Sequence, residues 1–253
     1  FPDADSNELQ CRSAFATLDY SYFIAANSKR FGQTPLVRLC DDGAYRLTDE
    51  FRSMLEQTTF RTFFTDTVEA GLFNALALAE SSRKHHIRQN HGFLYGEKYS
   101  VFDVMRLCGW PAEQVPQNVG GYKLDTETGS LPIFIKYEAS QYGDRFLNPG
   151  EIEWFSKNNR SLKSNEFRWL LDGTERTPEW QNRHFVPIFI RRKAEEQEKS
   201  YYFVGSAVAL DDVHASVNPG EDGSESKVVI STLKLGKPVD PELYRHLTGK
   251  SAL

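Results

Sequence analysis

The sequence predicts an α+β protein: a helical N-terminal segment followed by a curved antiparallel, barrel-like β domain with short helices. Two observations support this fold class. Apolar residues recur at helical spacing over roughly the first 95 residues, and at least five runs rich in Val, Ile, Phe and Tyr follow, separated by turn residues. Only short helices lie between these runs, which argues against a parallel sheet of strand–helix–strand units and favours a curved antiparallel sheet.

The N-terminal segment, residues 1–95, shows three local signals. Asp42-Gly43 is a hairpin turn signal between two short apolar runs. Thr48 is a helix cap, followed by Phe51, Met54 and Leu55 at helical spacing. The later stretch VEAGLFNALALAE has apolar residues on more than one face, which is typical of a helix packed between neighbours. A basic, His-rich stretch follows, and we place the domain boundary after it, near Gly96.

The second domain, residues 96–253, begins with an amphipathic helix between Ser100 as cap and Gly109 as stop. Strands are expected in GYKL and LPIFIKY, which flank the hairpin loop DTETGS, and then in HFVPIFIRRK, SYYFVGSAVAL and KVVISTLKL. The separators AEEQEK and DDVHASVNPGEDGSES are expected to be polar, mobile loops. A short helix in DPELYRHLTG closes the domain.

Composition narrows the class of protein. Eighteen Phe, eleven Tyr and four Trp in 253 residues can fill one large or two modest cores. No apolar run approaches the roughly 18 residues of a membrane span, and the acidic start FPDADSNEL is unlike a signal peptide. Three scattered cysteines, Cys11, Cys40 and Cys108, fit a reducing cytoplasm better than a disulfide framework. We expect a cytoplasmic protein without a membrane partner or cofactor, and the start at Phe1 suggests a piece of a longer chain.

Two groups of residues invite a catalytic interpretation. His85, His86 and His91 resemble the histidines of an HNH nuclease or a metal site, but no Cys or Asp lies in the turns that directly follow, so a solvated linker is the better interpretation. The acids from Asp211 to Glu225, with Lys227 after them, loosely imitate a metal-dependent nuclease. Their place in a polar loop favours solubility over catalysis. No phosphate-binding loop and no nucleophile elbow occurs.

The stretch from Tyr137 to Arg168 interleaves aromatic residues with basic and amide residues. Between Lys157 and Arg168, four basic residues and one acid give a local charge of +3 in a chain of net charge −5. Aromatic faces beside cations can stack bases and hold phosphates. On composition alone, core aromatics beside a solvated basic face are slightly preferred.

The order of six blocks carries a resemblance to a known family: YSVFDVMRLCGW, NVGGYK, PIFIKY, YGDRFLNPGEIEWFSKNNRSLKS, YYFVGSAVAL and LKLGKPVDPELYRHLTG. Together they resemble the C-terminal domain of SauUSI-like type IV restriction enzymes, over residues 93–249. In that family a phospholipase-D-like nuclease and a DEAD/DEAH-box helicase lie upstream. The resemblance implies an SRA/PUA-like curved barrel that recognises 5-methylcytosine or a related modified cytosine in double-stranded DNA, without catalysis in this chain.

The resemblance also suggests roles for individual residues. A flipped base needs replacement stacking, and Tyr122, Tyr137 and Trp154 are the candidates for that cage. Asp144 would accept the exocyclic amine of cytosine, with Ser156 as a further polar contact. Phosphates would be held by Arg145, Lys157, Arg160 and Lys163.

Two other functions stay open at this point. One is a metal-dependent nuclease that uses the acids from Asp211 to Glu225. The other is a structural domain whose helical segment, residues 1–95, docks on the upstream helicase or forms a homodimer.

Overall fold

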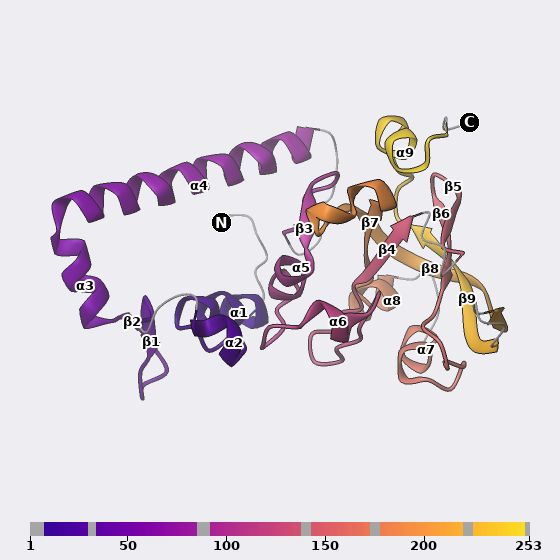
Figure 1. Ribbon diagram of the computed structural model, residues 1–253, viewed down its shortest axis with the longest axis horizontal. Coiled ribbons are helices and arrows are strands. Elements are labelled where there is room, and N and C mark those ends of the chain that lie inside the picture. Colours follow the sequence, from indigo (N-terminus) through magenta and orange to yellow (C-terminus); the bar gives the residue numbers. More distant parts are fainter. Residues whose placement is uncertain are drawn as a thin grey trace. The chain divides into compact units, whose positions relative to one another are not determined.

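The computed structural model describes residues 8–29, 34–84, 92–137, 143–172, 178–219 and 225–250 (Figure 1). The chain divides into two compact units: Phe1–Leu94 with Phe102–Gln114, and Tyr95–Val101 with Val115–Leu253. The first unit is mainly helical and the second contains a curled sheet. The predicted fold class is therefore confirmed.

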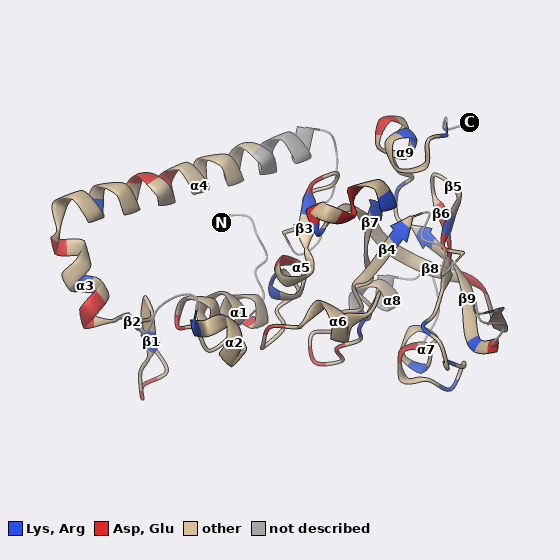
Figure 2. Cartoon of the chain, viewed as in Figure 1, with Lys and Arg blue, Asp and Glu red and all other residues tan. Residues whose placement is uncertain are grey.

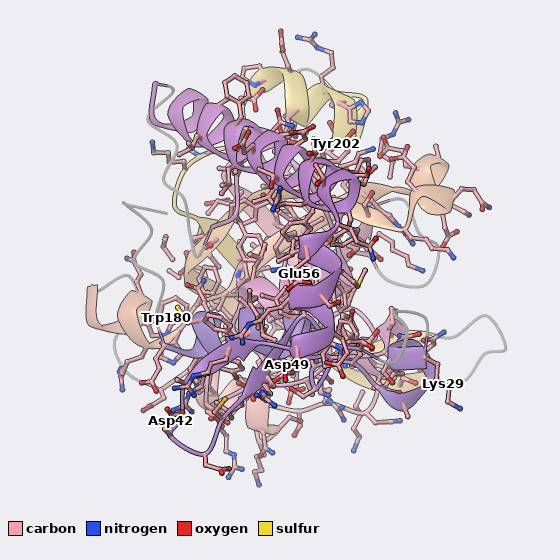
Figure 3. All side chains as sticks on the ribbon, turned by 90° about the vertical axis from the view of Figure 1, so that its left-hand side faces the viewer. Lys29, Asp42, Asp49, Glu56, Trp180 and Tyr202 are labelled. Atoms are coloured by element: carbon pink, nitrogen blue, oxygen red, sulfur yellow. The ribbon has the colours of Figure 1, made fainter. Side chains whose placement is uncertain are left out.

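The first unit begins with α1 (Glu8–Leu18) and α2 (Ala25–Ser28), followed by the hairpin of β1 (Val37–Leu39) and β2 (Tyr45–Leu47). This hairpin turns at the predicted Asp42-Gly43, where Gly43 has a φ of +79°. The predicted cap is also confirmed, because the Thr48 hydroxyl accepts the backbone N–H of Phe51 at 3.2 Å. That cap starts α3, which runs from Asp49 to Glu56 (Figure 3).

Helix α4 (Thr58–Lys84) packs on α3 at its start, where the Phe51 ring meets those of Phe60 and Phe64 edge-on. Further along, within VEAGLFNALALAE, Leu72, Phe73 and Leu76 are 51%, 72% and 50% exposed. The expectation that this helix is packed between neighbours is wrong for the described residues, because apolar side chains on its later turns face outward.

Helix α5 (Val101–Leu107) forms as predicted, with Val104, Met105 and Cys108 buried along one face. Gly109 follows it with a φ of +81°, and a Cβ there would lie 3.1 Å from the backbone of α1. Only glycine satisfies both constraints without strain, which is why it ends this helix.

The second unit is built on seven strands, six of which form the path β4-β7-β8-β9-β6-β5. Strand β3 (Lys98–Ser100) pairs with β8 beside this path. All pairs are antiparallel except β4 with β7, which run parallel, so the sheet is mixed rather than wholly antiparallel. The strands of the path are β4 (Ile133–Tyr137), β5 (Arg145–Asn148), β6 (Glu151–Phe155), β7 (Pro187–Arg192), β8 (Ser200–Pro219) and β9 (Glu225–Leu235).

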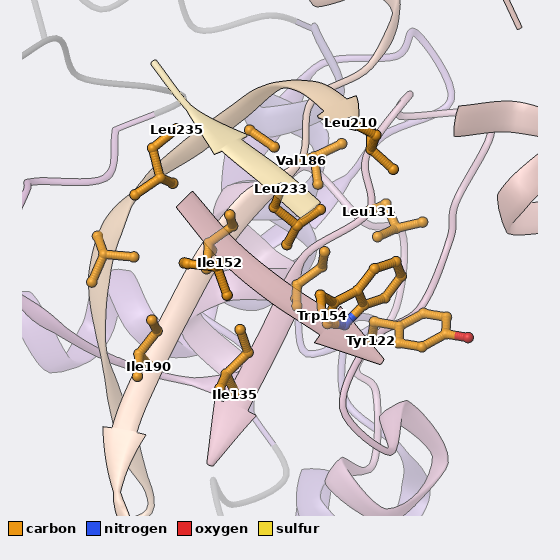
Figure 4. Packing of buried hydrophobic residues seen from close by; sticks show 14 of the residues in the cluster. Tyr122, Leu131, Ile135, Ile152, Trp154, Val186, Ile190, Leu210, Leu233 and Leu235 are labelled. Atoms are coloured by element: carbon orange, nitrogen blue, oxygen red, sulfur yellow. The ribbon is translucent and has the colours of Figure 1, made fainter. Parts of the chain in front are cut away.

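One hydrophobic cluster fills the inside of the curl (Figure 4), and every strand of the six-strand path contributes to it. The α-helices beside the sheet, among the described residues, are α6 (Pro116–Val119), α7 (Asn165–Leu170), α8 (Pro178–Arg183) and α9 (Pro241–Thr248). Phe167 of α7, Trp180 of α8 and Leu247 of α9 are fully buried in the cluster. Burial of each such side chain stabilises the fold by roughly 1.5–3 kcal/mol.

Several segments differ from the sequence expectations. The polar run after Leu210 continues β8 as far as Pro219 and pairs with β9, so it is not a loop. AEEQEK forms the 3-10 helix η2 (Lys193–Glu198). The hairpin around DTETGS is reduced to the isolated bridges Tyr122↔Ile133 and Asp125↔Ser130. The hairpin of β5 and β6 was not expected, and its turn is stabilised by the Asn148 side chain, which accepts the Gly150 N–H at 2.9 Å.

Glu195 joins four elements of the second unit. It accepts hydrogen bonds from Lys98 of β3 at 3.4 Å, Tyr202 of β8 at 3.4 Å and His246 of α9 at 3.1 Å. Burial raises the pKa of the Glu195 carboxyl, but the contacts with His246 and Lys98 outweigh burial and hold it below the ordinary value of 4.5.

We therefore expect Glu195→Gln to lower the free energy of unfolding at pH 7 by roughly 1–2 kcal/mol. The depressed pKa stabilises the wild type above pH 4.5, and this contribution is lost as pH falls through the folded pKa. Urea unfolding at pH 7 and pH 3 measures the difference. Glu198→Gln is the control, because the Glu198 side chain is 51% exposed and its ion pair among the described residues is with Lys98. An advantage of the wild type over E195Q that persists at pH 3 would contradict this role.

Candidate nucleic-acid interface

The basic turn, residues 156–164, connects β6 to α7. Two backbone bonds tether it to β9: Ser156 N–H donates to Val229 O at 2.9 Å, and Arg160 N–H donates to Lys227 O at 3.2 Å. Within the turn, the Ser161 N–H donates to the Ser164 hydroxyl at 3.1 Å. These bonds fix the backbone that presents the basic side chains.

The basic surface consists of the cations on this turn, on α7 and on the strand beside them (Figure 2). In the described part of the chain, no carboxylate forms an ion pair with Lys157, Lys163, Arg168 or Lys227. Lys227 was assigned to loop solubility from the sequence. Only the pairing of the turn with β9 brings it here, and the sequence carries no signal of that pairing. The basic surface is Lys157, Arg160, Lys163, Arg168 and Lys227.

Two predicted phosphate contacts are already paired. The Arg145 Nε lies 2.9 Å from Glu153 Oε2, and this pair joins β5 to β6. The Arg160 Nε lies 2.9 Å from Glu166 Oε1 on α7. The ammonium groups of Lys157 and Lys163 have no carboxylate partner among the described residues, so they are more available to a phosphate than the guanidinium groups of Arg145 and Arg160.

The three rings proposed for a base cage lie in the core, and Figure 4 shows two of them, Tyr122 and Trp154. Tyr122, Tyr137 and Trp154 are 4%, 7% and 2% exposed. The Tyr122 and Trp154 ring centroids are 5.0 Å apart, and Tyr137 lies 6.0 Å from the ring of Phe146. The Tyr137–Phe146 contact joins the edge strands β4 and β5, whereas the Tyr122–Trp154 contact joins the segment before β4 to β6. All three rings are packed against protein.

The Tyr122 hydroxyl connects the core to the basic turn. It donates to Glu166 Oε1 at 2.9 Å and accepts the Lys157 N–H at 3.2 Å. Burial, and then the nearby Glu166 charge, raise the pKa of this hydroxyl above its ordinary value. The Lys157 ammonium lies 4.6 Å from the Tyr122 ring centroid, a cation–π distance. Burial, and then the charge of Arg160, lower the pKa of Lys157.

The other two predicted base contacts have protein partners as well. The Ser156 hydroxyl is fully buried, accepts the Val229 N–H at 2.8 Å and donates to Lys157 O at 3.0 Å. Asp144 is half-buried and accepts the Phe155 N–H at 2.8 Å. Burial raises the pKa of the Asp144 carboxyl to about 7, with a smaller contribution from Glu153, while the Phe155 N–H lowers it.

An open hollow of about 780 Å³ borders α7. Trp169 and Arg168 line it from the helix, and Asp125 lines it from the segment before β4. Sequence reasoning did not find this hollow, because its two walls come from segments about 40 residues apart. The lining residues are Leu124, Asp125, Thr126, Asn165, Arg168, Trp169, Leu171 and Asp172.

Of the acids considered for a nuclease, Asp211 and Asp212 lie on β8 and Glu225 on β9, while Glu221 and Asp222 lie outside the described residues. Asp211 pairs with Lys234 at 3.2 Å, and Glu225 begins β9. Among the described residues, no group of three or more His, Cys, Asp or Glu side chains could hold a metal ion. The cluster of His85, His86 and His91 lies outside the described residues. No described helix combines the length and apolar character needed to cross a membrane.

Comparison with known proteins gives two family matches. Residues 93–247, more than half of the chain, match the family described as a domain of unknown function (DUF3427). Residues 3–79 match a second domain of unknown function (DUF8090). No curated protein matches the sequence.

Three solved structures are similar in part. The SUVH5 SRA domain with fully methylated CG DNA has a TM-score of 0.36 at 11% identity, covering 58% of this chain and 92% of that one. The sulfur-binding and SRA domains of ScoMcrA with phosphorothioated DNA score 0.35 at 14% identity, with 64% and 45% covered. The modification-dependent restriction endonuclease AspBHI scores 0.33 at 18% identity, with 63% and 42% covered. All three scores lie below 0.5, so the function is argued from the residues of this chain.

The raised pKa of Asp144 predicts a pH-dependent stability. Between pH 3.8 and about 7 the unfolded chain releases this proton before the folded chain does, so the folded state loses stability as pH rises. Asp144→Asn keeps an acceptor for the Phe155 N–H and cannot ionise. We expect it to match the wild type near pH 4 and to be more stable by roughly 2–4 kcal/mol above pH 7.

Urea unfolding at pH 4, 6 and 8 measures this difference. Asp172→Asn is the control, because the Asp172 side chain is 69% exposed, and its effect should stay within about 0.5 kcal/mol. A constant difference between Asp144→Asn and the wild type across this range would show that Asp144 is not held in its neutral form.

Proposed function

The chain belongs to the DUF3427 family, and we propose that its β-rich domain, residues 96–253, is a DNA-binding module that recognises a modified cytosine. The observation that carries this proposal is the basic surface. Lys157, Lys163, Arg168 and Lys227 lie without carboxylate partners among the described residues, in a chain whose net charge is −5. A polyanion is the partner that such a local concentration of positive charge fits.

The form of the surface supports a phosphate backbone as that polyanion. Three of the cations, Lys157, Arg160 and Lys163, lie on a turn held by backbone bonds, so little ordering of this loop is needed on binding. Contacts of this kind position a protein on DNA but carry no sequence information. Recognition of a particular base therefore needs a second element.

For that element we propose Asp144. An ionised carboxylate accepts the N4 amine of cytosine and repels the O4 carbonyl of thymine. Asp144 is half-buried and directly precedes β5, and its carboxylate accepts the N–H of Phe155, the last residue of β6 before the basic turn. Its pKa of about 7 means that the ionised and neutral forms coexist at neutral pH.

Base flipping is the more demanding part of the proposal. Tyr122, Tyr137 and Trp154 can stack on a flipped base only if the contacts that now bury them open. Base–aromatic stacking of about 1–3 kcal/mol would offset part of that cost. The Ser156 hydroxyl would become available to the base only if it left the Val229 N–H.

The block resemblance supports a place in a larger protein. We propose that the module recognises 5-methylcytosine or a related base for a type IV restriction enzyme in the cytoplasm, whose nuclease and helicase domains perform the chemistry. In this arrangement residues 1–95 brace the module against the helicase or against a second copy. This chain itself would not be catalytic.

A binding titration with methylated and unmodified duplexes of one sequence tests the proposal. Burial of a methyl group contributes ~0.8 kcal/mol, so we expect the methylated duplex to bind at least about fourfold tighter. Fluorescence anisotropy at 0.1 M salt measures both affinities. Equal affinities would remove the modified-base claim, and no binding to either duplex would remove the DNA-binding claim as well.

The basic surface predicts a loss that is independent of modification. Lys163→Gln removes one phosphate contact, so we expect both duplexes to bind roughly fivefold more weakly at 0.15 M salt. The slope of log K against log salt should become shallower by about 0.9. Lys193→Gln, on η2, removes the same charge outside the basic surface and is the control. Equal losses in the two variants would show that net charge, and not this surface, controls binding.

A further inference from the structure

Glu166 is a buried carboxylate inside a surface that is otherwise positive. The residue is 8% exposed and lies in the first turn of α7, between Lys163 and Arg168. Glutamates are rarely this buried unless they are paired, because removing the charge from water is costly. Its burial therefore needs an explanation.

One oxygen of this carboxylate makes two contacts. Glu166 Oε1 accepts the Tyr122 hydroxyl at 2.9 Å and lies 2.9 Å from the Arg160 Nε. The Tyr122 hydroxyl in turn accepts the backbone N–H of Lys157 at 3.2 Å. The carboxylate thus holds the side chain of Arg160 directly and the backbone of Lys157 through Tyr122.

Electrostatics alone would predict that Glu166 weakens DNA binding, because its negative charge repels phosphates and neutralises Arg160. The contacts of Glu166 with Arg160 and Tyr122 indicate instead that it supports DNA binding. We propose that Glu166 is a positioning residue, which holds Lys157 and Arg160 in the arrangement that binds DNA phosphates. This inference depends on the proposed DNA binding and adds a residue whose charge has the wrong sign for a direct contact.

Glu153 provides a matched comparison within the same domain. It also pairs with one arginine, since its oxygens lie 2.9 Å from Arg145 Nε and 3.4 Å from Arg145 Nη2. Its side chain is 23% exposed, and the pair lies on the β5–β6 hairpin rather than on the basic turn. Removing this charge should release Arg145 without loosening the turn.

The test compares Glu166→Gln with Glu153→Gln in the full chain, by anisotropy with a methylated duplex from 0.05 to 0.3 M salt. Gln keeps the shape of Glu but cannot form the ion pair. We expect E166Q to bind roughly five- to tenfold more weakly, with a salt slope shallower by about 0.9–1.8, which corresponds to one or two lost phosphate contacts. E153Q should bind as tightly as the wild type or more tightly.

Tyr122→Phe tests the same connection without a change of charge. It removes the hydroxyl that joins Glu166 to Lys157, so we expect weaker binding and a shallower salt slope here too. Gln can still accept the Tyr122 hydroxyl, so E166Q weakens this network rather than removing it, and Y122F with E166Q should lose less binding than the sum of the two single losses. This variant also decides the matter if E166Q proves too unstable to measure, and circular dichroism establishes which variants are folded.

The outcomes separate this inference from the proposed function. Binding by E166Q that equals or exceeds that of the wild type, with an unchanged salt slope, would overturn the positioning role and leave DNA binding intact. Losses in Y122F and E166Q that simply add would overturn it as well. A wild-type chain that binds no DNA would overturn both proposals together.

Discussion

The hydrogen bond between the Tyr122 hydroxyl and the Glu166 carboxylate is the interaction on which the surface of the second unit depends. It joins the segment that follows α6 to α7, the helix after the basic turn. A buried carboxylate and a buried phenol are each costly without a partner, so each makes the position of the other stable. Because Lys157 and Arg160 are bound to the same pair, the placement of the exposed charges follows from a bond inside the protein.

Closure of the sheet explains why that bond lies where it does. A six-strand path leaves two edges, β4 and β5, and exposed strand edges would pair with other chains. Here the rings of Tyr137 on β4 and Phe146 on β5 lie 6.0 Å apart, and Tyr122, ahead of β4, packs against Trp154 of β6. The rings therefore have a structural role that composition cannot distinguish from base stacking. Their burial follows from the need to close the curl around its core.

Local chemistry determined which parts of the fold could be predicted. The cap at Thr48, the stop at Gly109 and the closing helix after Asp240 depend on neighbouring residues, and all three are found in the structure. The parallel pairing of β4 with β7 could not be foreseen, because it joins segments about 50 residues apart with no pattern that records their direction. The polar run after Leu210 was wrongly predicted to be a loop for a related reason. Its backbone is satisfied by β9, a partner that only the tertiary fold supplies.

The candidate site was likewise predictable only where it depends on residues that are neighbours in the sequence. The local charge of the turn was visible in sequence because its residues are consecutive, whereas Lys227 joined it only through strand pairing and the hollow beside α7 only through packing. Glu166 would be counted from sequence as a charge that weakens the basic surface. Its effect depends on where its oxygens point, which composition does not encode.

The burial of the Tyr122, Tyr137 and Trp154 rings also limits which interactions could distinguish a modified base. Stacking is not available without opening part of the core, and a methyl group contributes only ~0.8 kcal/mol by burial. Under the proposed function Asp144 would separate cytosine from thymine, since a carboxylate facing a carbonyl oxygen is repelled while one facing an amine is bonded. Modified and unmodified cytosine carry the same amine, so preference for the modified base must come mainly from shape, through contacts that exclude the unmodified base. The pKa of Asp144 lies near 7, so its carboxyl group can be an ionised acceptor or a neutral donor, and nearby charges decide which form predominates. A phosphate backbone bound to the basic surface would be one of those charges.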